Sequence, residues 1–228
     1  RDLVRSRGLG DVYKRQLMSP LDIIEEMNRQ FDDAIITTDV GQHMMLVSQY
    51  AEITEKKQLV MSGGLGTMGY GFPAAIGAQI GNPEKRVIAV SGDGGMQMNI
   101  QEFATAVLEE TPVIACVFNN TYLGMVRQWQ KLFYGKRYGM TNLRAGALSR
   151  RTDGAEFPEY TPDFVKLAES YGAKGIRVTK TEEISAAFEE AKKNTKTPTL
   201  IEFIIDPEEM VYPMIKPGGT LEDMIMDC

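Results

Sequence analysis

Short apolar runs alternate with amphipathic stretches along most of this chain. Residues 87–91 and 113–118 are rich in β-branched side chains and show no polar alternation, which is typical of strands buried inside a parallel sheet. The stretches between such runs repeat apolar residues every three or four positions, as helices packed on one side do. The expected strands span 34–38, 59–61, 87–91, 113–118, 175–178 and 199–205. The expected helices span 20–31, 44–50, 73–80, 100–108, 123–133, 163–171 and 182–193, and Ser19 is the expected cap of the first.

The order of these elements predicts one α/β domain. Repeated strand–helix units predict a doubly wound, mainly parallel sheet of about six strands with helices on both faces. We place this domain at residues 17–206 and treat 207–228, with a short helix at 221–226, as its C-terminal tail. Residues 1–16 carry five basic and two acidic residues without an apolar period, so we expect a disordered or non-native tail. A long loop is expected at 139–162.

Composition limits the location and the partners of the chain. With 228 residues, 43% hydrophobic, and a net charge of −6, it has an ordinary globular composition and little electrostatic attraction for nucleic acid. No apolar run reaches the roughly 20 residues that a membrane span needs. Cys116 lies in an apolar run and Cys228 is the last residue, so we expect no disulfide framework and a reducing, cytoplasmic location. His43 is the single histidine, which excludes a site built from several histidines.

Two polar motifs end two successive expected strands. Gly92-Asp93-Gly94 follows one strand, and after 24 further residues Asn119-Asn120 follows the next. Open α/β sheets bind ligands at the carboxyl ends of their strands. A Gly-Asp-Gly sequence alone is more often a tight turn, but the second motif at this spacing favours a ligand site.

The oxygen atoms of these motifs suit a magnesium ion that holds a diphosphate. Asp93 offers an anionic oxygen, Asn120 an amide oxygen and Tyr122 its backbone carbonyl. Gly94 and Gly95 allow backbone N–H groups to approach phosphates at the start of the next helix. These residues therefore form the candidate metal and diphosphate site.

A glycine-rich run follows the short strand at 59–61. Its Gly64-x-Gly66-x-x-Gly69 spacing formally matches the dinucleotide-binding fingerprint, although the strand before it is very short. The other interpretation is a backbone loop packed against a flat heterocycle, with the Gly66 carbonyl as an acceptor and Met68 as an apolar wedge. Met68 taken alone is more often a core residue.

A turn and a helix complete the candidate chemistry. Val40, Gly41, Gln42 and His43 follow the strand at 34–38 and could present backbone and side-chain donors to a phosphate, whereas a lone histidine is usually structural. In the helix at 123–133, apolar residues lie on one face, a pattern that chiefly indicates packing in the core. Its first residues come directly after the candidate metal ligands, so this face is expected to border the pocket.

Together these motifs resemble the thiamin-diphosphate-dependent acetolactate synthases (acetohydroxyacid synthases). The motifs that carry the resemblance are Gly92-Asp93-Gly94 with Asn119-Asn120, the run Gly63-Gly64-Leu65-Gly66-Thr67-Met68-Gly69-Tyr70-Gly71, the turn Gly41-Gln42-His43 and Gly124-Met125-Val126-Arg127-Gln128-Trp129. The resemblance extends from Ser19 to the C-terminus, and 144–158 resembles an insertion. It points to the C-terminal thiamin-diphosphate-binding domain of the large, catalytic subunit.

The resemblance implies a role for each of these residues. Asp93, Asn120 and the Tyr122 carbonyl would bind Mg²⁺. Gly66 and Met68 would be the catalytic contributions of this domain, because they would hold the aminopyrimidine and bend the cofactor. The residues expected along the cofactor are Val40, Gly41, Gln42, His43, Gly66, Met68, Gly92, Gly94, Gly95, Asn120, Tyr122, Gly124 and Met125. Those expected at the substrate entrance are Met125, Val126 and Trp129.

The resemblance also implies the reaction and the partners. Family members decarboxylate pyruvate and join its two-carbon unit to a second 2-keto acid, in branched-chain amino acid biosynthesis. They act as homodimers or larger assemblies, with a regulatory small subunit as a further partner. An N-terminal domain supplies the catalytic glutamate and a central domain binds FAD, and 228 residues hold neither. We therefore expect an inactive fragment of a longer enzyme.

Two alternatives remain open at the sequence level. One is another thiamin-diphosphate enzyme, of the pyruvate oxidase or glyoxylate carboligase type. The other is a non-catalytic nucleotide-binding module of Rossmann type, which would bind NAD without a metal. Neither alternative involves nucleic acid or a membrane.

Overall fold

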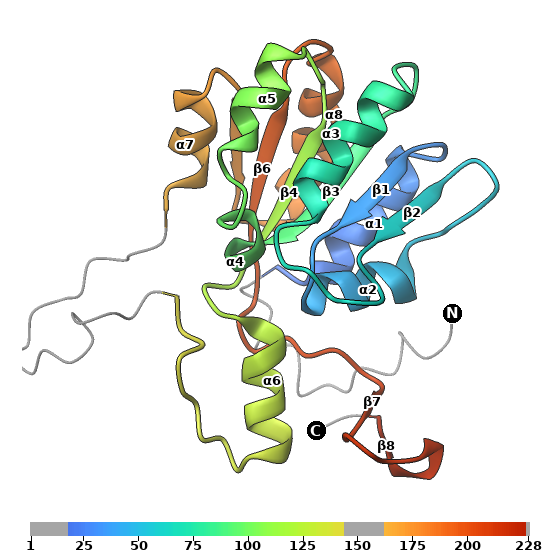
Figure 1. Ribbon diagram of the computed structural model, residues 1–228, viewed down its shortest axis with the longest axis vertical. Helices are drawn as coiled ribbons and strands as arrows, with labels where there is room; N and C mark the ends of the chain where they lie inside the picture. The colour runs from blue at the N-terminus through green and yellow to red at the C-terminus, as the bar shows by residue number, and fades with distance from the viewer. Residues whose placement is uncertain (1–17, 144–161, 227–228) are drawn as a thin grey trace, which may run out of the picture.

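A single parallel sheet forms the centre of the computed structural model, which describes residues 18–143 and 162–226. Its six strands lie in the order β2-β1-β3-β4-β6-β5 (Figure 1). All neighbouring pairs in this sheet are parallel. The α/β class and the sheet of about six strands are thereby confirmed. The strands are β1 (Ile35–Thr38), β2 (Gln58–Met61), β3 (Val87–Gly92), β4 (Ile114–Asn119), β5 (Lys174–Val178) and β6 (Thr199–Ile204).

Helices cover both faces of the sheet. Helices α1 (Pro20–Gln30), α2 (Gln42–Tyr50) and α8 (Ile184–Lys193) enclose one apolar cluster. Helices α3 (Gly71–Gly81), α5 (Glu102–Leu108) and α7 (Phe164–Ser170) enclose the other. The remaining elements are α4 (Asp93–Met96), α6 (Gly124–Phe133), the 3₁₀ turns η4 (Thr181–Glu183) and η5 (Leu221–Asp223), and the two-stranded pair β7 (Met214–Ile215) and β8 (Met224–Ile225).

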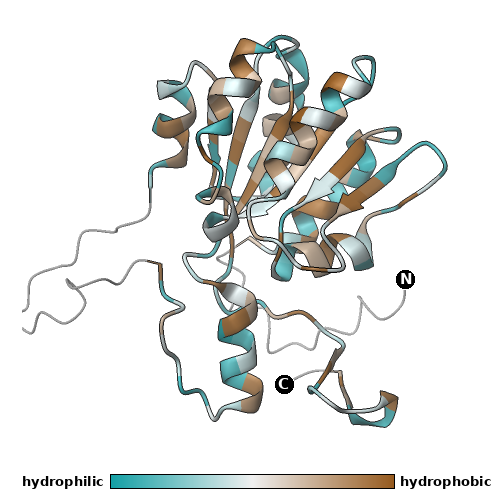
Figure 2. Cartoon of the chain, in the orientation of Figure 1, coloured by the Kyte–Doolittle hydropathy of each residue, from teal (hydrophilic) through white to brown (hydrophobic). Residues whose placement is uncertain are grey.

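The two-residue period of the strands explains this layering. Ile88 and Val90 belong to the cluster under α1, α2 and α8, whereas Val87 and Ala89 belong to the cluster on the opposite face. All four side chains are fully buried. The central strands are accordingly coloured mostly as hydrophobic, with paler positions near their carboxyl ends (Figure 2). A strand buried on both faces is apolar at most positions, so the short apolar runs of the sequence could be interpreted as interior strands.

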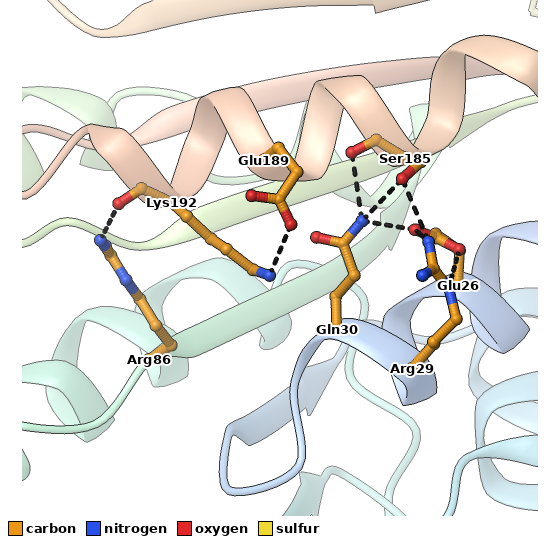
Figure 3. Close-up of polar contacts among 7 residues, drawn as sticks. All are labelled: Glu26, Arg29, Gln30, Arg86, Ser185, Glu189 and Lys192. Atoms are coloured by element: carbon orange, nitrogen blue, oxygen red, sulfur yellow. Dashed lines mark hydrogen bonds and ion pairs between the residues drawn. The ribbon is translucent and has the colours of Figure 1, made fainter.

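Polar contacts fasten α8 to the helix and strand beside it (Figure 3). Gln30 of α1 donates to the Ser185 carbonyl at 3.1 Å and to the Ser185 hydroxyl at 3.2 Å, and Arg29 donates to the same hydroxyl at 3.1 Å. Arg86, just before β3, donates to the Lys192 carbonyl at 2.6 Å. The Arg86 bond satisfies a carbonyl in the last turn of α8, and the contacts at Ser185 hold its first turn against α1.

Two differences from the predicted elements have physical reasons. Helix α4 was not predicted, because it is a four-residue turn of the sequence Asp-Gly-Gly-Met and glycine is a poor helix former. The helix expected at 221–226 is wrong: a 3₁₀ turn at Leu221–Asp223 is followed by β8, which pairs with β7. The predictions for residues 1–16 and 144–158 concern positions outside the described residues.

The chain order of the strands reverses around β1. Strand β2 lies on one side of β1 and β3 on the other, so the connections leaving β1 and β3 diverge to opposite faces. Such a reversal opens a crevice at the carboxyl ends of the strands. No helix in the described ranges is long and apolar enough to cross a membrane.

Candidate functional site

A cleft of about 260 Å³ lies at this crevice, above the carboxyl ends of β1, β3 and β4. Its walls come from the segments that follow those strands and from the segment after β6. The predicted cofactor residues that line it are Val40, Gly41, Gln42, His43, Met68, Gly92, Asp93, Gly94, Gly95, Asn120, Tyr122, Gly124 and Met125, together with Val126 of the predicted entrance. The fold therefore gathers segments up to about 190 residues apart in sequence, from Pro20 to Glu209, around one space.

Asp93 is the buried acid of the cleft. It is the first residue of α4, directly after β3, and its exposed fraction is 1%. The Oδ2 atom has no hydrogen-bond partner among residues 18–143 and 162–226. Burial raises the pKa of Asp93 to about 7, against backbone hydrogen bonds from Gly94 and Thr121 that lower it. A buried carboxylate with an unused oxygen is costly by itself and is stabilised by a bound cation.

The turn after β4 lies beside Asp93. Gly92 pairs with Phe118 across β3 and β4, so the residues that follow each strand emerge together. Asn120 accepts a hydrogen bond from the Tyr122 N–H at 2.9 Å through its Oδ1 atom. Between them, Thr121 has a φ of 63°, a left-handed conformation that is unusual for a β-branched residue. The turn is thus held in a shape that an ordinary loop would not adopt.

Segment 141–143 supports this turn from outside the sheet. The Leu123 N–H donates to the Thr141 carbonyl at 2.8 Å, and the Leu143 N–H donates to the Thr121 carbonyl at 2.9 Å. These bonds satisfy backbone groups that lie past the end of β4. The backbone that carries the predicted ligands Asn120 and Tyr122 is therefore fixed on both sides.

The imidazole of His43 packs between two glycines. A Cβ atom at Gly41 would lie 3.0 Å from His43 Cε1, and one at Gly92 would lie 3.1 Å from it. His43 is buried, and its Nε2 atom has no hydrogen-bond partner in the described part of the chain. Burial lowers the pKa of His43 to about 4, against the raising effect of the nearby Asp39 carboxylate. The ring is neutral near pH 7 and borders the cleft with an unpaired nitrogen.

Side chains packed directly against the backbone explain two glycines that line the cleft. A Cβ atom at Gly94 would lie 2.8 Å from Leu123 Cδ2 and 3.7 Å from Met68 Cε. A Cβ atom at Gly124 would lie 2.7 Å from Asn120 Nδ2. Larger residues at either position would occupy the cleft or displace its walls. The Met68 methyl group lies next to Gly94, the glycine that follows Asp93.

Two predicted residues lie outside the lining of the cleft. Gly66 is exposed, with a φ of 71°, and a Cβ atom there would be 3.8 Å from Val40 Cγ1, a lining atom. Trp129 lies one turn further along α6 than Met125 and Val126 and is 36% exposed. Its ring packs edge-on against Phe133, with centroids 5.9 Å apart. Both residues lie near the cleft in sequence, but the structure does not bring either into its wall.

Asp39 has a role that the sequence interpretation missed. Its buried carboxylate accepts from the N–H groups of Val40 at 2.9 Å, Gly69 at 2.8 Å and Gly71 at 3.0 Å. It thereby fastens the glycine-rich run between β2 and α3 to the end of β1. An acid directly after a buried strand was the available signal, but its partners are about 30 residues away in sequence.

The segment after β6 also contributes a wall that was not predicted. Ile205, Asp206 and Glu209 line the cleft. The Glu209 carbonyl accepts from Gln42 Nε2 at 3.1 Å, and the same Gln42 nitrogen donates to Gln128 at 2.8 Å. No motif marks this segment, because its contribution depends on where β6 ends in the sheet.

The arrangement defines a class of protein. Residues 39–203 match the family model described as thiamine pyrophosphate enzyme, C-terminal TPP binding domain. The match covers most of the chain, which therefore belongs to this family.

Individual relatives narrow the comparison. The chain is 42% identical, over 94% of its length, to the acetolactate synthase large subunit of Corynebacterium glutamicum. It is 42% identical over 90% of its length to the probable acetolactate synthase large subunit of Methanocaldococcus jannaschii, and 40% identical over 84% to the acetolactate synthase isozyme 3 large subunit of Escherichia coli. The chain covers only 33%, 32% and 31% of these relatives. The resemblance inferred from the motifs is confirmed, and the chain spans about a third of the relatives' length.

Proposed function

We propose that the cleft binds thiamin diphosphate through Mg²⁺. The buried, unpartnered Oδ2 atom of Asp93 carries this proposal, because a divalent cation would supply the partner that the protein does not. Asn120 and the Tyr122 carbonyl would complete the protein's share of an octahedral oxygen shell. The neutral His43 ring, Gln42 and the backbone of Gly94, Gly95 and Gly124 would contact the diphosphate.

The residues of this chain then have distinct tasks. When bound, thiamin diphosphate supplies a nucleophilic carbon and an electron sink for decarboxylating 2-keto acids. Met68, whose methyl group lies over Gly94, would support the bend of the cofactor, and the Gly66 carbonyl would accept from its amine. Met125 and Val126 would exclude water at the entrance, with Trp129 at its outer edge.

We further propose that the chain is part of a carboligase of the acetolactate synthase type. The names of the relatives support pyruvate and a second 2-keto acid as substrates. FAD, a homodimeric or larger assembly and a regulatory small subunit are proposed for the whole enzyme on the same resemblance. A cytoplasmic location stays a prediction from cysteine usage. The 228-residue chain alone is expected to bind cofactor without turnover, because the proton relay of the family needs a glutamate from another domain.

Calorimetry on the 228-residue chain tests the binding proposal. Thiamin diphosphate should bind with Mg²⁺ present and not with EDTA. Asp93→Asn should abolish this metal-dependent binding, whereas Asp33→Asn, at an exposed position, should leave it unchanged. Equal binding by Asp93→Asn and the parent chain would contradict the proposal.

The same titration separates the proposal from a Rossmann-type module, and product analysis separates it from other thiamin-diphosphate enzymes. A Rossmann-type nucleotide module would bind NAD in the presence of EDTA. A pyruvate oxidase or glyoxylate carboligase would share the metal-dependent binding but differ in product. Product analysis on an enzyme completed with the remaining domains of a relative therefore separates those two from an acetolactate synthase.

A further inference from the structure

A buried carboxylate outside the cleft is connected to the predicted metal-binding turn. Three carboxylates are buried in the described residues: Asp39, Asp93 and Glu202. Asp39 holds the glycine-rich run and Asp93 faces the cleft, whereas Glu202 lies within β6 and does not line the cleft. Its two oxygens are both used, one by Asn119 Nδ2 at 2.8 Å and the other by Arg177 Nε at 2.7 Å.

The sheet register brings these side chains together. Glu202 pairs with Arg177 on β5 and with Val117 on β4. Asn119 is two residues beyond Val117, so its side chain leaves the same face of the sheet, diagonally from Glu202. Arg177 reaches outward to Asp163 at 2.6 Å, at the cap of α7. A continuous polar chain thus runs from the surface to the end of β4.

Glu202 decides the orientation of the Asn119 amide. A carboxylate only accepts hydrogen bonds, so the amide must turn its NH₂ group toward Glu202 and its oxygen away. That oxygen accepts from the Thr121 N–H at 3.1 Å. The bond closes the turn around Thr121 in its left-handed conformation. On either side of Thr121 lie Asn120 and Tyr122, the predicted metal ligands.

We infer that Glu202 and Arg177 are positioning residues for the metal-binding turn, acting through Asn119. This inference rests on the proposed function, since the turn is taken to hold Mg²⁺. Leu200, two residues before Glu202, and Val117, its partner on β4, are fully buried members of one apolar cluster, and a leucine at 202 would continue that core. Replacing a buried ion pair by apolar residues is often neutral or stabilising, so stability alone does not explain the pair.

The test compares metal affinity with stability. In the Arg177→Leu and Glu202→Leu double variant of the 228-residue chain, the affinity for Mn²⁺ in the presence of thiamin diphosphate should fall roughly 10- to 100-fold. The probe is free Mn²⁺, measured by electron paramagnetic resonance. The melting temperature without ligands should not fall. Glu202→Gln, which keeps one oxygen for Asn119, should lose less affinity than Glu202→Leu.

A control variant removes a different ion pair of the same strand. Lys174 of β5 pairs with Glu190 at the surface. Lys174→Gln with Glu190→Gln should leave Mn²⁺ affinity unchanged. Unchanged affinity in the folded Arg177→Leu and Glu202→Leu variant would overturn the inference.

A ligand-free measurement separates this inference from the proposed function. Amide hydrogen exchange at Thr121 should accelerate in Glu202→Leu, because the amide of Asn119 is then free to turn. If the parent chain binds no Mn²⁺, the proposed function fails, and with it the ligand half of the inference. Thr121 exchange still decides whether Glu202 holds the turn: an unchanged rate overturns that role.

Discussion

Two residues of the cleft bury polar atoms without partners among the described residues, which lowers the stability of the ligand-free chain. Asp93 buries an unpartnered carboxylate oxygen, and His43 buries an unpartnered nitrogen. Both atoms border the same space. Unsatisfied buried polar groups destabilise a folded protein, so their clustering indicates a binding site whose ligand would supply the missing partners.

Asp93→Asn should therefore stabilise the ligand-free chain while removing its response to cofactor. We expect a gain of roughly 1–3 kcal/mol in the free energy of unfolding, because a neutral amide costs less to bury than a carboxylate. The parent chain should gain about 2.7 kcal/mol when Mg²⁺ and thiamin diphosphate are near 100 times their Kd, and the variant should gain nothing. Thermal and denaturant unfolding measure both effects. A variant that is less stable without ligands would contradict this argument.

The raised pKa of Asp93 also predicts the pH dependence. Metal binding needs the carboxylate form, so the apparent affinity for Mg²⁺ with thiamin diphosphate should fall about tenfold per pH unit below the pKa of about 7 and level off above it.

The stability of the metal-free chain should depend on pH in the opposite direction. The folded pKa exceeds the unfolded one, so this group's contribution is present at low pH and is lost as pH rises through about 7. His43, whose pKa is lowered to about 4, acts in the opposite sense between about 4 and 6.5. Comparing the parent chain with Asp93→Asn across pH isolates the Asp93 contribution.

At the scale of elements, two glycines of one helix have opposite roles. Gly71 begins α3, and a Cβ atom there would lie 2.5 Å from the Asp39 backbone nitrogen. Gly77, in the middle of α3, has nothing within 4 Å of such a Cβ. Gly71→Ala should cost roughly 1–3 kcal/mol or more through overpacking against backbone. Gly77→Ala should instead stabilise by about 0.5–1 kcal/mol, because alanine is the better helix former. Denaturant unfolding of the two variants checks the contrast.

The elements themselves were largely predictable, and the reason is local. A strand buried on both faces is largely apolar, so β3 and β4 could be predicted within one residue of their observed bounds. The carboxyl-end motifs then followed from strand order. Contacts that depend on three-dimensional register were not predictable: Glu202 has its partners 25 and 83 residues away, and Asp39 reaches Gly69 and Gly71 across a loop. No periodicity encodes such pairs.

At the scale of the whole molecule, α6 and the segment with β7 and β8 extend beyond the carboxyl end of the sheet (Figure 1). Gln128 of α6 joins them, accepting from the Val211 N–H at 3.0 Å and donating to the Val211 carbonyl at 2.8 Å. This region exposes large apolar residues, with Trp129 36% and Met140 94% exposed. Exposed apolar patches of this kind commonly mark interaction surfaces.

This arrangement predicts self-association coupled to cofactor binding. The whole enzyme is proposed to assemble as a homodimer or larger, so we expect a second copy to cover the exposed apolar residues of this region and complete the cleft. The chain should sediment as a concentration-dependent dimer, and its apparent affinity for thiamin diphosphate with Mg²⁺ should rise with chain concentration. Replacing Trp129 and Met140, which do not line the cleft, by lysine should abolish both dependences. Leu108→Lys is the matched control, because Leu108 is 81% exposed and ends α5, a helix that lies beside the sheet and away from α6 (Figure 1). A parent chain that stays monomeric, with cofactor affinity independent of its concentration, would show that one copy supplies the whole binding site.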